Sequence, residues 1–288
     1  MACLFAARLA AAGIPVAMTG DWAPGLEALE KGGVRLVQAD GSEQAYPVQA
    51  IRDTQTCEPA QYALVLVKSW QTERTARRLF ECLAAGGLAL TMQNGLGNRE
   101  KLIQALGPDR VALGVTTCGA TLLSPGRVVP AGQGLVALNG TPGLAPLGEL
   151  LKQAGFQVEN VDDARALLWG KLVVNAAINP LTALLGVPNG DLLGRQETRR
   201  LMAELAGEAA GVAKALGIHL HYDDPAAAAE YVAQRTATNH SSMLQDICNG
   251  RPTEIDAICG EIVRLGEQTG IPTPVNRVMW QLVKAKEK

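Results

Sequence analysis

The first 21 residues read MACLFAARLAAAGIPVAMTGD, and their pattern decides the fold class of the N-terminal half. Residues 1–12 predict a helix that is apolar nearly all round. Gly13 then stands where glycine favours a left-handed helix stop, and residues 14–19 predict a short buried strand. Because a helix without a polar face has to pack inside the protein, we expect it to lie against a sheet. Asp21 follows the strand.

This order matches the second half of a dinucleotide-binding unit, which runs strand, glycine-rich turn, helix, strand and acidic residue. In such a unit the helix N-terminus approaches a pyrophosphate and the acid lies near a ribose. Here no strand and no Gly-x-Gly precede the helix, and Ala2 holds the third small-residue position of the fingerprint. We expect that roughly ten residues of the unit are missing upstream, through a misassigned start codon or a shortened chain. The alternative is a surface helix that opens an unrelated fold.

Buried apolar runs alternate with helical patterns as far as residue 161, which indicates a parallel sheet with helices on both faces. Glycine and valine between residues 124 and 138 add hairpin-like strands. The expected strands are 63–67, 88–92, 111–116 and 157–161, and the expected helices are 73–84, 99–106 and 146–155.

Beyond residue 163 only helical patterns remain, at 164–185, 197–216, 226–236, 254–269 and 274–286. The predicted fold class is therefore α/β. A Rossmann-like parallel sheet domain at residues 1–163, without its first strand and glycine loop, is followed by an all-helical domain at residues 164–288.

The composition is that of an ordinary globular protein, with 288 residues, 48% hydrophobic and 19% charged. A net charge of −2 offers no broad basic surface to nucleic acid or to an anionic membrane. We find no apolar run of about 20 residues, which a membrane span needs, and no signal peptide. The six cysteines form no Cys-x-x-Cys pair, and the three histidines do not cluster with acids or cysteines. We expect a cytoplasmic protein with reduced thiols and no metal site.

Polar residues follow two of the expected strands, where open α/β sheets bind their ligands. Lys68-Ser69-Trp70-Gln71 comes after one strand, and Gln93-Asn94-Gly95 comes after the next. A glycine-flanked amide such as Asn94 can hydrogen-bond a cofactor or a substrate. The alternative is that Asn-Gly forms only a turn.

A third polar pattern lies within an apolar helix. Lys171, Asn175 and Asn179 are spaced i, i+4 and i+8, so they share one helix face, and Pro180-Leu181-Thr182 follows. A lysine and two amides cost free energy if they are buried without partners, so the line predicts a site. Alternatively, the lysine reaches the surface and the asparagines cap loops.

Two further polar stretches follow, at residues 239–246 and 253–256. Thr253 can cap a helix that starts at Glu254, where an acid is favourable. The local sequence alone favours this helix-start role for the acids.

Taken in order, these stretches resemble the ketopantoate reductases. The resemblance rests on Lys-x-x-x-Asn-x-x-x-Asn-Pro-Leu-Thr, Ser-Ser-Met-x-Gln-Asp and Thr-Glu-Ile-Asp, with Lys-x-Trp-Gln and Gln-Asn-Gly in the first domain, and it covers essentially the whole chain. It implies hydride transfer from a reduced nicotinamide to the C2 carbonyl of 2-dehydropantoate, a small molecule, giving pantoate for coenzyme A synthesis.

The resemblance also implies roles for single residues. Lys171 matches the general acid that protonates the C2 alkoxide, and Glu254 matches the acid that holds the substrate hydroxyl or orients the lysine. The matched binding positions are Asn175, Asn179 and Ser242 for the substrate, Lys68 and Asn94 near cofactor and substrate, and Ala2 and Asp21 for the cofactor.

Asp21 departs from the family pattern, in which many relatives have an arginine for the 2′-phosphate of NADPH. Two unit charges about 5 Å apart repel by roughly 3 kcal/mol at an effective dielectric constant of about 20. Asp21 therefore argues for NADH, while the family expectation, which we place first, is NADPH.

Two other functions stay open. One is reduction of another keto acid or an imine by a member of the 6-phosphogluconate-dehydrogenase-like group. The other is a non-catalytic paralogue that binds metabolites. A monomer or a homodimer is expected, with no nucleic-acid or membrane partner.

Overall fold

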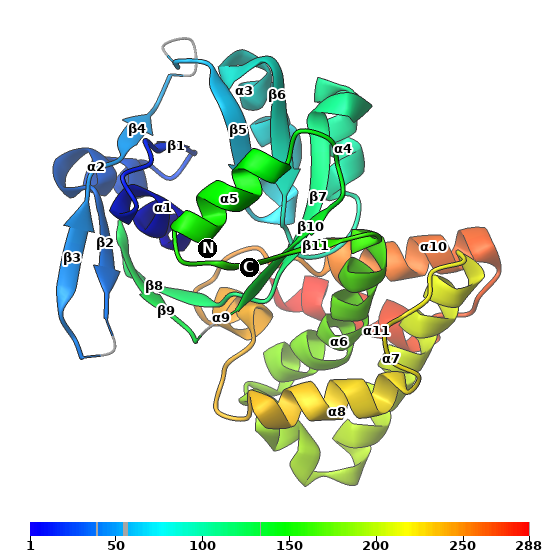
Figure 1. Cartoon of the computed structure of the whole chain (residues 1–288). Helices are drawn as coiled ribbons and strands as arrows, with labels where there is room; N and C mark the ends of the chain where they lie inside the picture. The colour runs from blue at the N-terminus through cyan, green and yellow to red at the C-terminus, as the bar shows by residue number, and fades with distance from the viewer. Residues whose placement is uncertain (39, 54–56, 133, 288) are drawn as a thin grey trace. The chain divides into compact units, whose positions relative to one another are not determined.

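The structure is a computed structural model that describes residues 1–38, 40–53, 57–132 and 134–287 (Figure 1). The chain divides into two compact units. Unit 1 comprises Met1–Val67, Gln71–Gln93 and Arg99–Ala164, and unit 2 comprises Lys68–Trp70, Asn94–Asn98 and Arg165–Lys288. The two polar loops that follow strands in the sequence thus pack with the second unit.

The apolar first segment forms α1 (Ala2–Ala11), and the prediction that this helix is buried is confirmed. Leu4 and Phe5 are each 1% exposed, and the ring of Phe5 stacks on that of Phe156 with centroids 4.3 Å apart. Gly13 follows the helix with φ at +76°, in the left-handed region that favours glycine. The next strand is β1 (Ala17–Thr19).

The main sheet of unit 1 has five strands in the order β11-β10-β7-β6-β5. Strands β5, β6 and β7 run parallel, as predicted, whereas β10 runs antiparallel to β7. The sheet is therefore mixed rather than wholly parallel. Its strands are β5 (Ala60–Val65), β6 (Leu83–Thr91), β7 (Val111–Thr116), β10 (Leu135–Asn139) and β11 (Gln157–Val161), and the helices along this part of the chain are α3 (Thr72–Cys82), α4 (Asn98–Leu106) and α5 (Ala145–Gln153).

Strand β1 belongs to a separate two-stranded sheet, in which it pairs in parallel with β4 (Gln49–Ile51). Among the described residues no ladder joins β1 to β5, although Val16 and Leu64 pack against the same buried cluster around Phe5. Most residues of β5 are only half-buried despite their apolar character. In the described part of the chain, β1 thus pairs with β4 alone and β5 with β6 alone.

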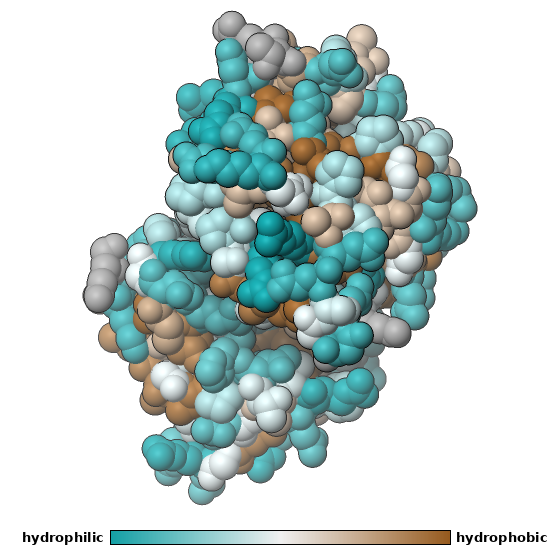
Figure 2. All heavy atoms as spheres, turned by 90° about the vertical axis from the view of Figure 1, so that its left-hand side faces the viewer, coloured by the Kyte–Doolittle hydropathy of each residue, from teal (hydrophilic) through white to brown (hydrophobic). Residues whose placement is uncertain are grey.

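A four-stranded sheet of order β3-β2-β9-β8 covers the other side of α1, where Leu4 packs with Val34 and Val128. Its β8–β9 hairpin lies a few residues before the hairpin expected between residues 124 and 138. Figure 2 looks onto the side where β2 and β3 lie and shows hydrophilic residues interspersed with hydrophobic ones. The elements are α2 (Ala23–Gly32), β2 (Val34–Val37), β3 (Glu43–Tyr46), β8 (Ala120–Ser124) and β9 (Arg127–Pro130).

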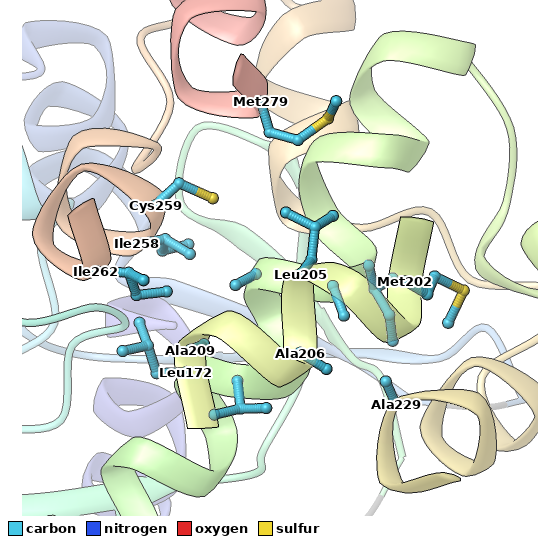
Figure 3. Close-up of a cluster of buried hydrophobic side chains, with 14 of the residues drawn as sticks. Leu172, Met202, Leu205, Ala206, Ala209, Ala229, Ile258, Cys259, Ile262 and Met279 are labelled. Atoms are coloured by element: carbon cyan, nitrogen blue, oxygen red, sulfur yellow. The ribbon is translucent and has the colours of Figure 1, made fainter. Parts of the chain in front are cut away.

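The regular elements of unit 2 are all helices within its described residues, as predicted. Side chains from several helices form one core, in which Leu172, Leu205 and Ile262 are buried (Figure 3). The helices are α6 (Ala164–Leu185), the 3-10 segment η4 (Asn189–Gly194), α7 (Gln196–Ala215), α8 (Pro225–Arg235), α9 (Ser242–Cys248), the π-helix η5 (Asp256–Gly260), α10 (Glu261–Thr269) and α11 (Pro274–Lys286).

Helix α6 contributes eight buried side chains to this core. Its 22 residues are long and apolar enough to cross a membrane, so the expectation that no such run exists was wrong. However, 67% of the apolar window is buried inside the protein, as in the core helix of a folded domain. The same helix carries Lys171, Asn175 and Asn179.

Candidate active site

Gln93 ties together the two loops that follow β5 and β6. Its side-chain Nε2 donates to the carbonyl of Val67 at 3.0 Å and to Thr72 Oγ1 at 2.8 Å, and Thr91 Oγ1 lies 3.0 Å from its Oε1. These groups are buried or partly buried. Since buried polar groups with all their partners are rigid, the amide fixes the ends of neighbouring parallel strands relative to each other.

The second loop is anchored on η5. The Leu96 N–H donates to the carbonyl of Ala257 at 2.8 Å. Gly95 has φ at +80°, and a Cβ on it would lie 2.6 Å from that same carbonyl oxygen. Only glycine fits there, so the Asn-Gly sequence is required for close packing on η5 and not merely for a turn. This contact holds the half-buried Asn94 in place.

Glu254 is 6% exposed, and its carboxylate faces these loops. It accepts a hydrogen bond from the backbone N–H of Ser69 at 3.0 Å and from Asn94 Nδ2 at 3.5 Å. Lys68 Nζ lies 3.7 Å away. The local capping role goes instead to Thr253, whose Oγ1 accepts from the N–H of Ile255 at 3.2 Å. The structure therefore brings Lys68, Asn94 and Glu254 together.

Asp246 is a member of this cluster that the sequence analysis did not single out. It is 7% exposed, and its Oδ2 lies 2.5 Å from Lys68 Nζ. Burial raises the pKa of this carboxyl above its ordinary value, although the ammonium of Lys68 opposes the shift. The signal was present, because Asp246 closes the Ser-Ser-Met-x-Gln-Asp stretch. Lys68 thus lies between two buried carboxylates.

The polar line on α6 ends in a second anchor. Lys171 and Asn175 are half-buried, and Asn179 is 8% exposed. One turn after Asn179, the buried hydroxyl of Thr182 lies 2.7 Å from Ser241 Oγ. Ser241 in turn accepts from the N–H of Leu244 and caps α9.

Ser242, the predicted substrate-binding serine, is the exposed first residue of α9. The link between Thr182 and Ser241 therefore fixes the start of α9 on the helix that carries Lys171. Exposure leaves the hydroxyl of Ser242 accessible to a ligand.

The turn of α6 that carries Lys171 is packed closely by a loop. A Cβ on Gly170 would lie 2.4 Å from the ring of His221, so a larger residue there would have to displace that exposed ring. The hydroxyl of Tyr222 donates to the carbonyl of Gly170 at 2.9 Å, and burial raises the pKa of Tyr222 to about 12. A phenol is protonated at neutral pH even at its ordinary pKa of about 10, so this hydroxyl is a donor there.

The nucleotide-binding positions lie in unit 1. Ala2 is the exposed first residue of α1, and the earliest intrahelical donor is the N–H of Leu4, which bonds to the Met1 carbonyl at 2.9 Å. Asp21 follows β1 and forms ion pairs with Arg74 and Arg78 of α3. Neither arginine lies in one of the sequence motifs quoted above.

These residues fit one part of a nicotinamide dinucleotide. The charged group around Asp21 stands where the fold places an adenosine ribose, and the N-terminal turn of a helix such as α1 suits an anion. No Gly-x-Gly precedes α1, so the glycine turn of a complete unit is not among these residues. Within the described part of the chain, no three histidine, cysteine or acidic side chains are grouped as metal ligands would be.

Two family models match the chain. Residues 1–142 match Ketopantoate reductase PanE/ApbA, and residues 163–287 match Ketopantoate reductase PanE/ApbA C terminal. Among curated proteins, a 2-dehydropantoate 2-reductase of Archaeoglobus fulgidus is 37% identical, over 91% of this chain and 86% of the relative. One of Halobacterium salinarum is 32% identical, over 95% of this chain and 91% of the relative.

Solved structures agree with these relatives. A PanE/ApbA family ketopantoate reductase from Ralstonia eutropha superposes with a TM-score of 0.92 at 33% identity, covering 99% of this chain and 94% of the other. A D-mandelate dehydrogenase solved with NADH and anilino(oxo)acetate also has a TM-score of 0.92, at 25% identity, covering 98% of this chain and 94% of the other.

Proposed function

The chain belongs to the ketopantoate reductase family, and on that premise we propose that it reduces the C2 ketone of 2-dehydropantoate to pantoate. The observation that carries the proposal is the cluster around Glu254. A buried carboxylate is held there by a backbone N–H and an amide, in the same unit as Lys171. Burying a carboxylate costs free energy unless it is paired and hydrogen-bonded, and here Lys68, the Ser69 N–H and Asn94 supply those partners.

Lys171 acts as the general acid. When the ketone gains a hydride, negative charge develops on the C2 oxygen, and the ammonium of Lys171 stabilises this charge and donates a proton to it. Its position within an apolar helix supports this role, because a charge acts more strongly where little water screens it. The bound reduced nicotinamide supplies the hydride.

Glu254 and Asn94 position the substrate. The carboxylate of Glu254 accepts a hydrogen bond from the substrate hydroxyl or orients the ammonium of Lys171. Lys68 compensates part of the negative charge at Glu254 and Asp246. Asn175, Asn179 and Ser242 supply amide and hydroxyl donors suited to the carboxylate of a 2-keto acid.

NADPH is the proposed hydride donor, with NADH as the alternative. The carboxylate of Asp21, which argues for NADH from the sequence, is ion-paired with two arginines in the structure and no longer stands as an uncompensated negative charge. We further propose that the enzyme works in the cytoplasm as a monomer or a homodimer.

The test is turnover by the purified protein. The protein is mixed with 2-dehydropantoate and either NADPH or NADH, and oxidation of the nicotinamide is followed by its absorbance. We expect the rate of oxidation to saturate with substrate, and we expect Lys171→Met to lower that rate strongly. If the parent oxidises neither nucleotide faster than Lys171→Met does, the proposal is wrong. That result would favour the alternative of a non-catalytic paralogue that binds metabolites.

A second candidate is reduction of an aromatic 2-keto acid. The similarity to D-mandelate dehydrogenase favours this candidate. Its fold superposes on this chain as well as the fold of the Ralstonia reductase does, although its sequence identity is lower. Comparing kcat/KM for 2-dehydropantoate and phenylglyoxylate separates the two. A higher value for the aromatic acid would reassign the substrate while leaving the chemistry unchanged.

A further inference from the structure

An acid and two arginines form a compact charged group in unit 1. Each carboxylate oxygen of Asp21 has its own guanidinium, with Oδ2 facing Arg74 and Oδ1 facing Arg78. The side chain of Asp21 is 22% exposed, that of Arg78 is 25% exposed and that of Arg74 is 54% exposed. The group is therefore partly shielded and still open to a ligand from solvent.

The fold places this group at a ribose position. Asp21 lies two residues beyond the end of β1, the strand that follows α1. Arg74 and Arg78 are spaced i and i+4 on α3, so they share one face of a helix that starts after β5. In open α/β folds, the residue after this strand contacts the adenosine ribose, and a nearby arginine accommodates a 2′-phosphate where there is one.

The charges of the group favour an anion. One carboxylate and two guanidinium groups leave a net charge of +1. Guanidinium groups bind phosphate through two parallel hydrogen bonds, in the same geometry in which they bind a carboxylate. Asp21 receives one Nη2 contact from each guanidinium, and a guanidinium has five N–H donors, so Asp21 holds the two arginines side by side with further donors for the oxygens of a phosphate.

We propose that Arg74 and Arg78 bind the 2′-phosphate of NADPH, with Asp21 as the positioning residue that holds the two guanidinium groups in the free protein. The proposal rests on the proposed function only in that the chain uses a nicotinamide dinucleotide. It assigns cofactor selectivity to α3, whereas many relatives place an arginine at the position of Asp21.

Adenosine 2′,5′-bisphosphate and adenosine 5′-monophosphate test this directly, because they differ only by the 2′-phosphate. Their dissociation constants are measured by calorimetry, without substrate or turnover. We expect the bisphosphate to bind the parent at least about tenfold more tightly, as charge-assisted hydrogen bonds allow. The difference should shrink as the salt concentration rises.

Variants of the arginines on α3 show which residues give the preference for the 2′-phosphate. Arg74→Ala with Arg78→Ala should bring the two dissociation constants to within about twofold, with monophosphate binding unchanged. Arg77→Ala is the matched control, because Arg77 is an exposed arginine on the same helix, and it should retain the parental ratio. If the double variant does not fold, the single change Arg74→Ala, at the more exposed arginine, should lower the ratio by itself.

Equal binding of the two nucleotides by the parent, including no measurable binding of either, would overturn the proposal. So would an equal effect of Arg77→Ala and the double change. Either result leaves the reductase function untouched, since turnover of 2-dehydropantoate with NADH needs no 2′-phosphate site. Conversely, a protein that lacks reductase activity but shows the selective binding would retain this site and lose only the proposed reaction.

Discussion

The ammonium of Lys68 lies 2.5 Å from the carboxylate of Asp246, a residue 178 positions further along the chain. The same ammonium lies 3.7 Å from Glu254, so one lysine serves two buried acids. An isolated buried carboxylate is costly, and a shared cation lowers that cost while leaving a net negative charge. The ion pair thus joins the Lys-x-Trp-Gln loop to α9 and to the segment that carries Glu254.

The first prediction concerns the pH dependence that Asp246 contributes. Burial raises the pKa of its carboxyl, so the folded protein keeps this proton to a higher pH than the unfolded chain does. The contribution of Asp246 to the free energy of unfolding therefore falls as pH rises from the ordinary value, about 4, through the raised folded-state value. Asp246→Asn removes this dependence.

We therefore compare the free energy of unfolding of Asp246→Asn with that of the parent. The value for the variant minus the value for the parent should become more positive as pH rises from acidic to neutral. Urea unfolding at several pH values measures this difference. A difference that stays constant would show that pairing with Lys68 balances burial at this carboxyl, and one that becomes more negative towards neutral pH would show that pairing outweighs burial. Either result contradicts the prediction.

Lys171 is expected to act in the chemical step. Lys171→Met should lower kcat by about 10²–10⁴-fold, because proton donation and stabilisation of the alkoxide are lost together. Binding of adenosine 5′-monophosphate should not change. Lys214→Met, at an exposed lysine of α7, is the control and should turn over at the parental rate. If Lys171→Met retains more than a third of the parental kcat, Lys171 is not the general acid.

Glu254 is expected to act in substrate binding. Glu254→Gln keeps an oxygen acceptor for the Ser69 N–H but removes the charge, so KM for 2-dehydropantoate should rise by about tenfold or more. Asp256→Asn, at a largely exposed carboxylate two residues away, should leave KM unchanged. Steady-state kinetics show whether Glu254 binds the substrate or only holds the loops in place. An unchanged KM with a lower melting temperature would mean that Glu254 only holds the loops in place.

Gly95 and Gly97 form a matched pair for testing the anchor on η5. Both have φ at +80°, but a Cβ on Gly95 would meet Ala257 at 2.6 Å, whereas a Cβ on Gly97 would meet nothing closer than 3.7 Å. Gly97→Ala should cost about 1–2 kcal/mol of stability through its backbone alone. Gly95→Ala should cost about 1–3 kcal/mol more, because the loop has to move away from η5.

Urea unfolding compares the two glycine variants, and kcat/KM should also fall further in Gly95→Ala than in Gly97→Ala because Asn94 is displaced. Equal losses of stability in both variants would mean that the contact with Ala257 yields easily and does not fix Asn94.

Local pattern alone was enough to predict much of the fold. The apolar helix in residues 1–12, the strands near residues 63–67 and 111–116, and the helical second half were predicted from apolar runs and helical periodicity. Burial imposes such periodicity on neighbouring residues, so it survives in the sequence. No element was predicted in residues 22–62, although α2 lies there. Strands β2, β3 and β4 have only three or four residues each, too few to show a period, and β3 is mostly exposed.

The tertiary structure decided the contacts between residues that are far apart in the sequence. The sequence placed Lys171, Asn175 and Asn179 on one helix face, because that relation lies within a single helix. It did not pair Asp21 with Arg74 and Arg78, nor Lys68 with Asp246, and it favoured a helix-start role for Glu254. A carboxylate's partners depend on which segments the fold brings within a few ångströms, and charge is felt through space rather than along the chain. The sequence alone therefore determined the fold class and the polar line on α6, while only the tertiary structure decided which charges meet.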